Sequence, residues 1–313
     1  MSERLGVLIA IVSSALGGTA AAVTRYLVGD ADPLTLAILR WGIGFLCVLP
    51  VTLALRAPFP KRGDWPGVAL LGVLFFGLFF IFYNIAVGYT TAARASLALA
   101  TLPPQTMLIG ALLGAEPLTW RKFTGVAIAV LGVLAALASG LGAAPAGAPR
   151  SGLPDLGDFT AQVGSSLLAM RGEAIMIGAV FCMAFYNVLS RPYISRSSAL
   201  GFLTVGMGCG AAALVLTGLI TGRAAVLANF GAPQWIAGIY LGIGGGALAF
   251  ILWVMALQRA TPTRVANTMT VNPIAAALLA TVLVGEPITL NLVAGLVAVF
   301  AGIWIATTER ANL

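Results

Sequence analysis

The sequence predicts an all-α polytopic membrane protein with ten transmembrane helices, arranged as two inverted five-helix repeats. Three observations carry this prediction. Of the 313 residues, 60% are hydrophobic and only 9% are charged, whereas soluble domains carry about 25% charged residues. The apolar residues form continuous runs of about 20 residues, which is the length that a helix needs to cross a bilayer. Finally, the second half of the chain repeats the first.

Ten apolar runs predict the ten spans. In chain order they cover residues 5–28, 34–56, 65–88, 91–114, 119–141, 170–190, 198–221, 234–258, 262–284 and 289–308. Because the runs are continuous, they predict helices rather than the alternating segments of about ten residues that build membrane barrels. The first run is too long for the apolar core of a cleavable signal peptide, so we expect it to be a span.

A stretch rich in proline and glycine separates two halves. We predict a first five-helix repeat over 1–141, a linker over 142–169 and a second five-helix repeat over 170–313. At an offset of 170 residues the halves match at chemically distinctive positions: Trp65 with Trp235, Arg94 with Arg264, and Pro103 with Pro273. Since five is odd, the second repeat would enter the membrane in the opposite direction, as in many secondary transporters.

The positions of lysine and arginine predict the orientation. With the N-terminus inside, the cytoplasmic loops hold most of the basic residues, including Lys61, Arg62, Arg121 and Lys122, and this bias is typical of cytoplasmic loops. An even number of spans returns the C-terminus to the same side. We therefore expect a multi-pass protein of the inner (plasma) membrane with both termini in the cytoplasm. The net charge of +7 fits this orientation better than nucleic-acid binding.

The residue inventory argues against an enzyme. The chain has no histidine, the residue most used for acid–base chemistry and metal binding near neutral pH. Cys47, Cys182 and Cys209 lie inside apolar runs and read as small buried hydrophobes, so we predict neither a disulfide nor a metal site. We expect no cofactor and no nucleic-acid partner; the expected partners are the lipid bilayer and a small-molecule substrate, an amino acid or a similar metabolite.

Two motifs resemble a known family. One motif follows the fourth span as Gly114-Ala115-Glu116-Pro117 and the ninth as Gly285-Glu286-Pro287, and the other, Leu39-Arg40-Trp41, lies early in the second span. Together with two five-helix halves, these motifs resemble the drug/metabolite transporter superfamily, EamA type, over nearly the whole chain. The resemblance implies export of small metabolites through a central cavity, and the general similarity is to exporters of aromatic and other neutral amino acids. Exporters of other metabolites or drugs are the alternative, as is a channel or a scaffold without turnover.

Polar residues beside prolines predict a substrate cavity in the middle of the membrane. Pro103 and Pro273 each remove a helical hydrogen bond and free a carbonyl, which in lipid must be satisfied by protein or face a wet cavity. The neighbouring polar candidates for the cavity are Thr101, Gln105, Asn267 and Asn272. The alternative is a kink that neighbouring helices repair.

Aromatic residues predict the rest of the lining. The candidates are Phe80, Tyr83 and Asn84 in the third span, Phe181, Phe185 and Asn187 in the sixth, and Trp253 in the eighth. Tyr83 and Trp253 correspond in the repeat and are candidate gates, although an interfacial belt or plain packing is the alternative. Rings mixed with amides suit a neutral, amphipathic solute such as an amino acid.

Charged residues receive mainly structural roles. Arg40 is a carboxylate-binding or gating cation, or else an interior arginine that binds helix-end carbonyls or reaches the surface, and we favour the structural role. Glu116 and Glu286 precede the starts of two spans, where we predict helix capping rather than proton coupling. Because no predicted span has an acidic residue near its middle, we hypothesise facilitated, gradient-driven transport, with coupling through a less obvious site as the alternative.

Overall fold

The computed structural model describes residues 3–115 and 170–286, together with isolated positions between 120 and 131 and between 288 and 301. In these residues, eight helical segments are long and apolar enough to cross a membrane. They cover Glu3–Leu27, Pro33–Ala54, Arg62–Tyr89, Ala92–Leu112, Arg171–Arg196, Ala199–Thr221, Ala232–Leu257 and Pro262–Leu283. They match eight of the predicted spans. The predicted spans 119–141 and 289–308 and the linker fall outside the continuously described residues.

Four of the segments are unbroken helices. They are α1 (Glu3–Leu27), α2 (Pro33–Ala54), α9 (Arg171–Arg196) and α10 (Ala199–Thr221). Capping side chains mark the starts of α2 and α10, where they satisfy backbone N–H groups that have no partner within the helix. Ser198 caps α10 by accepting from the Gly201 N–H at 2.8 Å, and Gly222 ends this helix with a φ of +69°, a conformation that glycine adopts without strain.

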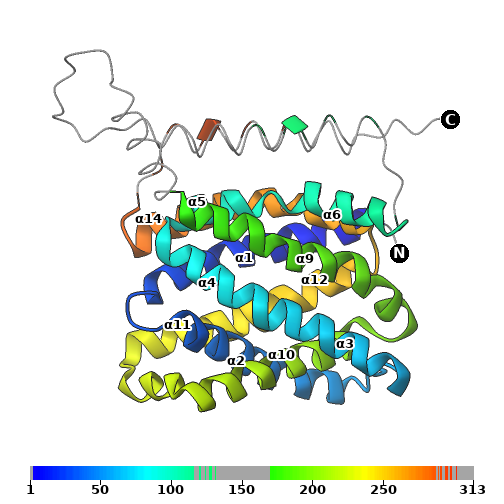
Figure 1. The fold of residues 1–313 in the computed structure, drawn as a ribbon, viewed down its shortest axis with the longest axis horizontal. Helices are drawn as coiled ribbons and strands as arrows, with labels where there is room; N and C mark the ends of the chain where they lie inside the picture. The colour runs from blue at the N-terminus through cyan, green and yellow to red at the C-terminus, as the bar shows by residue number, and fades with distance from the viewer. Residues whose placement is uncertain are drawn as a thin grey trace, which may run out of the picture.

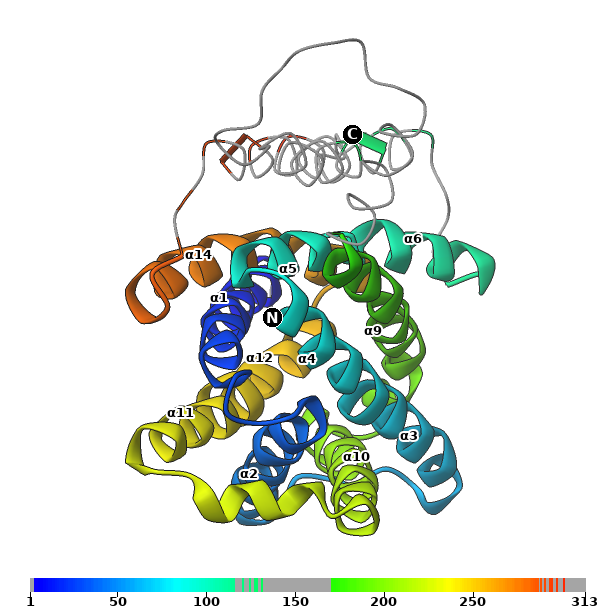
Figure 2. The same ribbon diagram turned by 60° about the vertical axis from the view of Figure 1, so that its left-hand side comes forward.

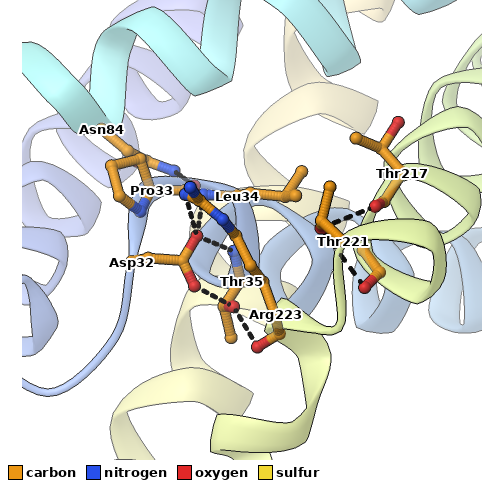
Figure 3. A network of polar contacts seen from close by, with 9 residues as sticks. Asp32, Pro33, Leu34, Thr35, Asn84, Thr217, Thr221 and Arg223 are labelled. Atoms are coloured by element: carbon orange, nitrogen blue, oxygen red, sulfur yellow. Dashed lines mark hydrogen bonds and ion pairs between the residues drawn. The ribbon is translucent and has the colours of Figure 1, made fainter.

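The start of α2 is held by a polar network (Figure 3). Asp32 Oδ1 accepts from two backbone N–H groups of the first turn at 3.0 and 3.3 Å, and Pro33 occupies the first helical position. Two residues from other helices join this turn. Arg223 Nη1 lies 3.6 Å from Asp32 Oδ1, and Asn84 Nδ2 donates to the Pro33 carbonyl at 2.8 Å.

Two segments contain a π-helical turn at corresponding positions. One consists of η1 (Arg62–Asp64), α3 (Trp65–Gly72), the π-helix η2 (Val73–Phe79) and α4 (Phe80–Tyr89). The other consists of α11 (Ala232–Gly242), the π-helix η4 (Ile243–Leu248) and α12 (Ala249–Leu257), after the short 3-10 helix η3 (Arg223–Asn229). The two π-helices begin 170 residues apart, and such turns are frequent at functional sites.

The two remaining segments break just before their prolines. The first consists of α5 (Ala92–Leu99) and α6 (Leu102–Leu112), and the second of α13 (Pro262–Asn267), the 3-10 turn η5 (Thr268–Thr270) and α14 (Val271–Leu283). Pro103 and Pro273 follow the two breaks directly, as expected because a proline ring clashes with the carbonyl four residues earlier.

Helices from the two halves of the chain interlock (Figures 1 and 2). From the first half, α1 packs on α12 and α14, and from the second half, α9 packs on α4 and α6. The helices α2 and α10 contact each other, while α2 also contacts α11 and η4 and α10 also contacts α3 and η2. Figure 2 shows α5, α6 and α14 crossing one side of this bundle.

Ion pairs mark the two ends of the bundle. The end that we call the Glu3 end holds the pairs Glu3–Arg264 at 2.5 Å and Asp64–Arg196 at 2.9 Å. The opposite end, called the Arg25 end, holds the pairs Arg25–Glu286 at 3.3 Å and Arg94–Glu173 at 2.6 Å. Hence α1 runs from the Glu3 end to the Arg25 end, and α9 runs the other way.

Candidate functional site

A small cavity lies inside the bundle, with walls from both halves of the chain. Its volume is about 30 Å³, which is room for one or two water molecules but far below the 300–1,000 Å³ of typical ligand pockets. The lining residues are Ser13, Gly17, Arg40, Phe79, Phe80, Tyr83, Leu99, Met183, Ala249, Phe250, Trp253, Met269 and Asn272. A solute of metabolite size can therefore enter this cavity only if the surrounding helices move apart.

Aromatic side chains form one wall of the cavity. Trp41 lies behind it, with its ring centroid 4.4 Å from that of Phe80 and 5.1 Å from that of Phe250. Trp253 completes the wall, is almost fully buried, and donates from Nε1 to Asn187 Oδ1 at 3.0 Å. These edge-to-face contacts join α2, α4 and α12, and they hold the ring faces in fixed orientations.

Arg40 is the charged residue among the described lining residues. Its side chain is 3% exposed, and Nη2 donates to the Gly245 carbonyl of η4 at 2.7 Å. The Arg40 Cζ atom lies 4.7 Å from the Phe80 ring centroid and 5.1 Å from that of Trp41. Gly245 permits this arrangement, because a Cβ at that position would collide with Ala20 of α1.

A second wall comes from α1, η5 and α14, with Ser13, Gly17, Met269 and Asn272. Ser13 donates to the Ala249 carbonyl at 2.7 Å, and Ser14 and Thr268 share a hydrogen bond of 2.9 Å. Gly17 leaves space for Asn272, whose Nδ2 would lie 2.8 Å from a Cβ at that position. Small residues on α1 thus bring it close to α14, as is common between membrane helices.

The structure brings five of the predicted site residues together at this cavity: Arg40, Phe80, Tyr83, Trp253 and Asn272. Arg40 was expected to be structural, and it does bind a backbone carbonyl, but it also lines the cavity. The amides of two other candidates are used elsewhere. Asn187 supports Trp253 from behind, and Asn84 holds the start of α2 (Figure 3).

Several predicted lining residues lie away from the cavity. Thr101 and Gln105 sit at the break between α5 and α6, where Gln105 Nε2 donates to the Ile177 carbonyl at 2.9 Å and bridges to α9. Asn267 is buried without lining the cavity. Phe181 and Phe185 are 42% and 38% exposed on the outer surface of α9, so they do not line it either; Met183 lies on the inward face of this helix.

Glu286 has partners in the first half of the chain. Its Oε2 accepts from the Ala92 N–H, at the start of α5, at 3.0 Å, and its Oε1 lies 3.3 Å from Arg25 Nε. It therefore caps a helix of the first half. The helix start that was expected to follow it lies outside the described residues, as does Glu116.

The sequence reasoning missed two features near the ends of the bundle. Glu173 is buried in the first turn of α9, where its Oε1 accepts from Arg94 Nε and from the Thr90 hydroxyl, both at 2.6 Å. A pocket of about 550 Å³ lies at the Glu3 end between the last turns of α9 and α12, and its lining includes Gln258 and Arg259. The repeat offers a signal for the first, because Glu3 and Arg264 are the counterparts of Glu173 and Arg94.

The family of the chain follows from sequence comparison. The model of the EamA-like transporter family matches residues 4–138 and again residues 170–308. The chain belongs to the EamA-like transporter family. The EamA-type resemblance of the motifs is thus confirmed, and the protein is a multi-pass membrane transporter by family.

This EamA-like protein matches several proteins named as transporters, exporters or efflux pumps, and each match covers most of both chains. An uncharacterized transporter of Archaeoglobus fulgidus is 23% identical over 94% of this chain and 95% of that protein. A probable terminal-alkyne amino-acid exporter of Streptantibioticus cattleyicolor is 25% identical over 83% of this chain and 80% of that protein. A probable amino-acid metabolite efflux pump of Salmonella typhimurium is 25% identical over 86% and 92%.

A solved crystal structure has the same fold. It superposes with a TM-score of 0.68, covers 97% of this chain and 96% of its own, and is 21% identical in sequence. At this identity the likeness concerns the fold alone.

Proposed function

We propose that this EamA-like protein exports neutral amino acids, aromatic ones included, by alternating access through the central cavity. The observation that carries the proposal is the composition of that cavity, which joins ring faces, one arginine and one asparagine from both halves of the chain. Such a lining suits an amphipathic solute with one carboxylate, because rings bind apolar groups and a guanidinium binds carboxylate oxygens. Two relatives carry names of amino-acid exporters or efflux pumps, which supports the same substrate class.

The mechanism rests on two inverted repeats, 1–141 and 170–313, joined by the linker 142–169. Three features support this arrangement: the family model matches each half, the π-helices start 170 residues apart, and α1 and α9 run in opposite directions. The exchanged packing of α1 on α12 and α14 and of α9 on α4 and α6 fits a two-fold relation. Inverted repeats give two arrangements of similar energy, one open to each side.

We further propose an inner-membrane location with both termini in the cytoplasm, on the basis of the lysine and arginine distribution. Fusions of a reporter that is active on only one side of the membrane, placed at Met1 and at Leu313, test this topology. Reporter activity from opposite sides of the membrane would contradict an even number of spans.

Counterflow in proteoliposomes tests the function. Vesicles loaded with an unlabelled neutral amino acid and diluted into its labelled form should accumulate label transiently, because a carrier exchanges the two forms. A channel gives no such overshoot, and a scaffold gives no uptake. A panel of neutral amino acids should be compared with other metabolites and with drugs, and exclusive transport of the latter would assign the protein to the alternative class.

The same vesicles test coupling. In the described residues no carboxylate lines the cavity, and we propose facilitated transport that needs no ion gradient. Uptake that occurs only with an imposed proton or sodium gradient would refute this part of the proposal.

A further inference from the structure

Arg40 is a buried cation whose hydrogen-bonding capacity is largely unused. A guanidinium carries five N–H donors, yet in Arg40 only Nη2 has a hydrogen-bond partner, while Nε and Nη1 are buried without one. In the described part of the chain, no carboxylate lies within ion-pair distance of it. Buried charges without partners are costly, so the cavity offers a strong site for an anionic group.

The rings beside Arg40 do not meet this need. Phe80 and Trp41 lie near the guanidinium, at 4.7 and 5.1 Å from Cζ, and such cation–π contacts stabilise the positive charge. The Phe80 and Trp41 rings provide no acceptor for the N–H groups in the guanidinium plane, and the Tyr83 hydroxyl, which also interacts with Arg40, satisfies neither Nε nor Nη1. A planar carboxylate does, because it accepts two parallel hydrogen bonds from an arginine.

Asn272 presents a complementary unpaired group to the same cavity. Its side chain is 2% exposed, and Oδ1 is buried without a hydrogen-bond partner. Its Nδ2 lies 3.9 Å from the Met269 sulfur, which is a weak acceptor. A buried amide oxygen with free lone pairs suits a cationic donor such as an ammonium group.

We propose that Arg40 binds the α-carboxylate and Asn272 the α-ammonium of one zwitterionic amino acid. Both groups lie near the same turn of α1. Arg40 lies beside Gly245, which packs on Ala20, and Asn272 lies beside Gly17. Three residues of helix advance about 4.5 Å along the axis. Arg40 and Asn272 therefore lie at a similar depth in the bundle, and both line the cavity, so that one small molecule can contact both when the helices move apart. The inference rests on the proposed function and names the chemistry that selects its substrates.

Derivatives of one amino acid test the assignment. The neutral amino acid with the fastest counterflow should be compared with its amide, which lacks the carboxylate, and with its N-acetyl form, which lacks the ammonium. Charge-assisted hydrogen bonds predict that the wild type transports each derivative about 10-fold to 100-fold more slowly. Arg40→Met should erase the preference over the amide, and Asn272→Leu the preference over the N-acetyl form.

Matched variants separate recognition from folding. Arg223→Met also removes one positive charge, but at an exposed position outside the cavity, and it should keep both preferences. Arg40→Lys keeps the charge without the planar fork and should keep part of the preference over the amide. These preferences are ratios within one variant, so a lower yield of folded protein does not change them.

The outcomes distinguish the two proposals. Equal counterflow of the amide and the amino acid by the wild type would overturn the carboxylate assignment while leaving the proposed function intact. An unchanged preference in Arg40→Met or in Asn272→Leu would overturn the assignment of that residue. If the wild type moves no neutral amino acid at all, the proposed function fails.

Discussion

Glu173→Gln probes the ion pair that links the two halves at the Arg25 end. The substitution keeps the size of the side chain and removes its charge. The carboxylate is 1% exposed, and its partner Arg94 is 29% exposed. The repeat supplies a matched control, because Glu3 and Arg264 form the corresponding pair at the other end, where these side chains are 43% and 37% exposed.

The magnitude follows from burial. Removing one partner of a fully buried pair costs about 3–5 kcal/mol, but Arg94 keeps partial contact with solvent, and glutamine retains an oxygen that accepts from the Thr90 hydroxyl. We expect a loss of about 2 kcal/mol, close to the value of a hydrogen bond to a charged group. For Glu3→Gln we expect about 0.5 kcal/mol, as for an exposed ion pair.

Thermal unfolding of the purified protein in detergent measures the difference, with the wild type and both variants in the same buffer. Glu173→Gln should lower Tm clearly more than Glu3→Gln. High salt should reduce the Tm difference between Glu3→Gln and wild type more than the Tm difference between Glu173→Gln and wild type, because exposed pairs are screened more strongly than buried ones. An equal or larger effect of Glu3→Gln would refute the reasoning from burial.

Three further substitutions test the cavity and its walls. Gly245→Ala should lower Tm, because the added Cβ meets Ala20, whereas the same change at Gly42, where nothing lies within 4 Å, should be neutral or stabilising by up to about 1 kcal/mol. Trp253→Phe leaves Asn187 Oδ1 without its donor and should cost about 1–3 kcal/mol in unfolding free energy; an unchanged Tm would argue against this hydrogen bond. Phe80→Ala should reduce counterflow by removing the ring beside Arg40, whereas Phe181→Ala, on the exposed face of α9, should leave the rate within about twofold of wild type, since surface substitutions away from special features have small effects.

The positions of the spans could be predicted because their determinants are local. Run length positions the eight described segments, and capping side chains lie at the starts of four of them, among them Asp32 before α2 and Ser198 before α10. The breaks near Pro103 and Pro273 are equally local, since proline acts on its own helical turn. The π-helices were not predicted, although the glycines from Gly244 to Gly246 lower helix propensity where one of them forms.

The inward faces of the helices were harder to predict. A soluble helix has an apolar stripe that faces the core, but a membrane helix is apolar all round, and its lipid-facing side can carry large rings. In α9, Phe181 and Phe185, the aromatic pair chosen from the sequence, face outward, while Met183 and Tyr186 are buried. Arg40 could be singled out in the sequence because charged residues are rare within membrane spans. Only the structure, through the unpaired N–H donors of Arg40, makes it a candidate for binding rather than for packing.

The repeat predicts which residues of the two halves correspond, but it does not predict how deeply each of them is buried. An offset of 170 residues places Glu3 against Glu173 and Arg94 against Arg264, and each of the two ion pairs joins one half of the chain to the other. Nevertheless, Glu173 is buried at the Arg25 end, while Glu3 is exposed at the end that also holds the pocket of about 550 Å³. The residue types in the two pairs are identical, so their different burial arises from the arrangement of the helices around them. Under the alternating access proposed above, we expect the opposite arrangement to bury the Glu3–Arg264 pair and to expose the Arg94–Glu173 pair, so that the burial of the two pairs would report the side to which the cavity opens.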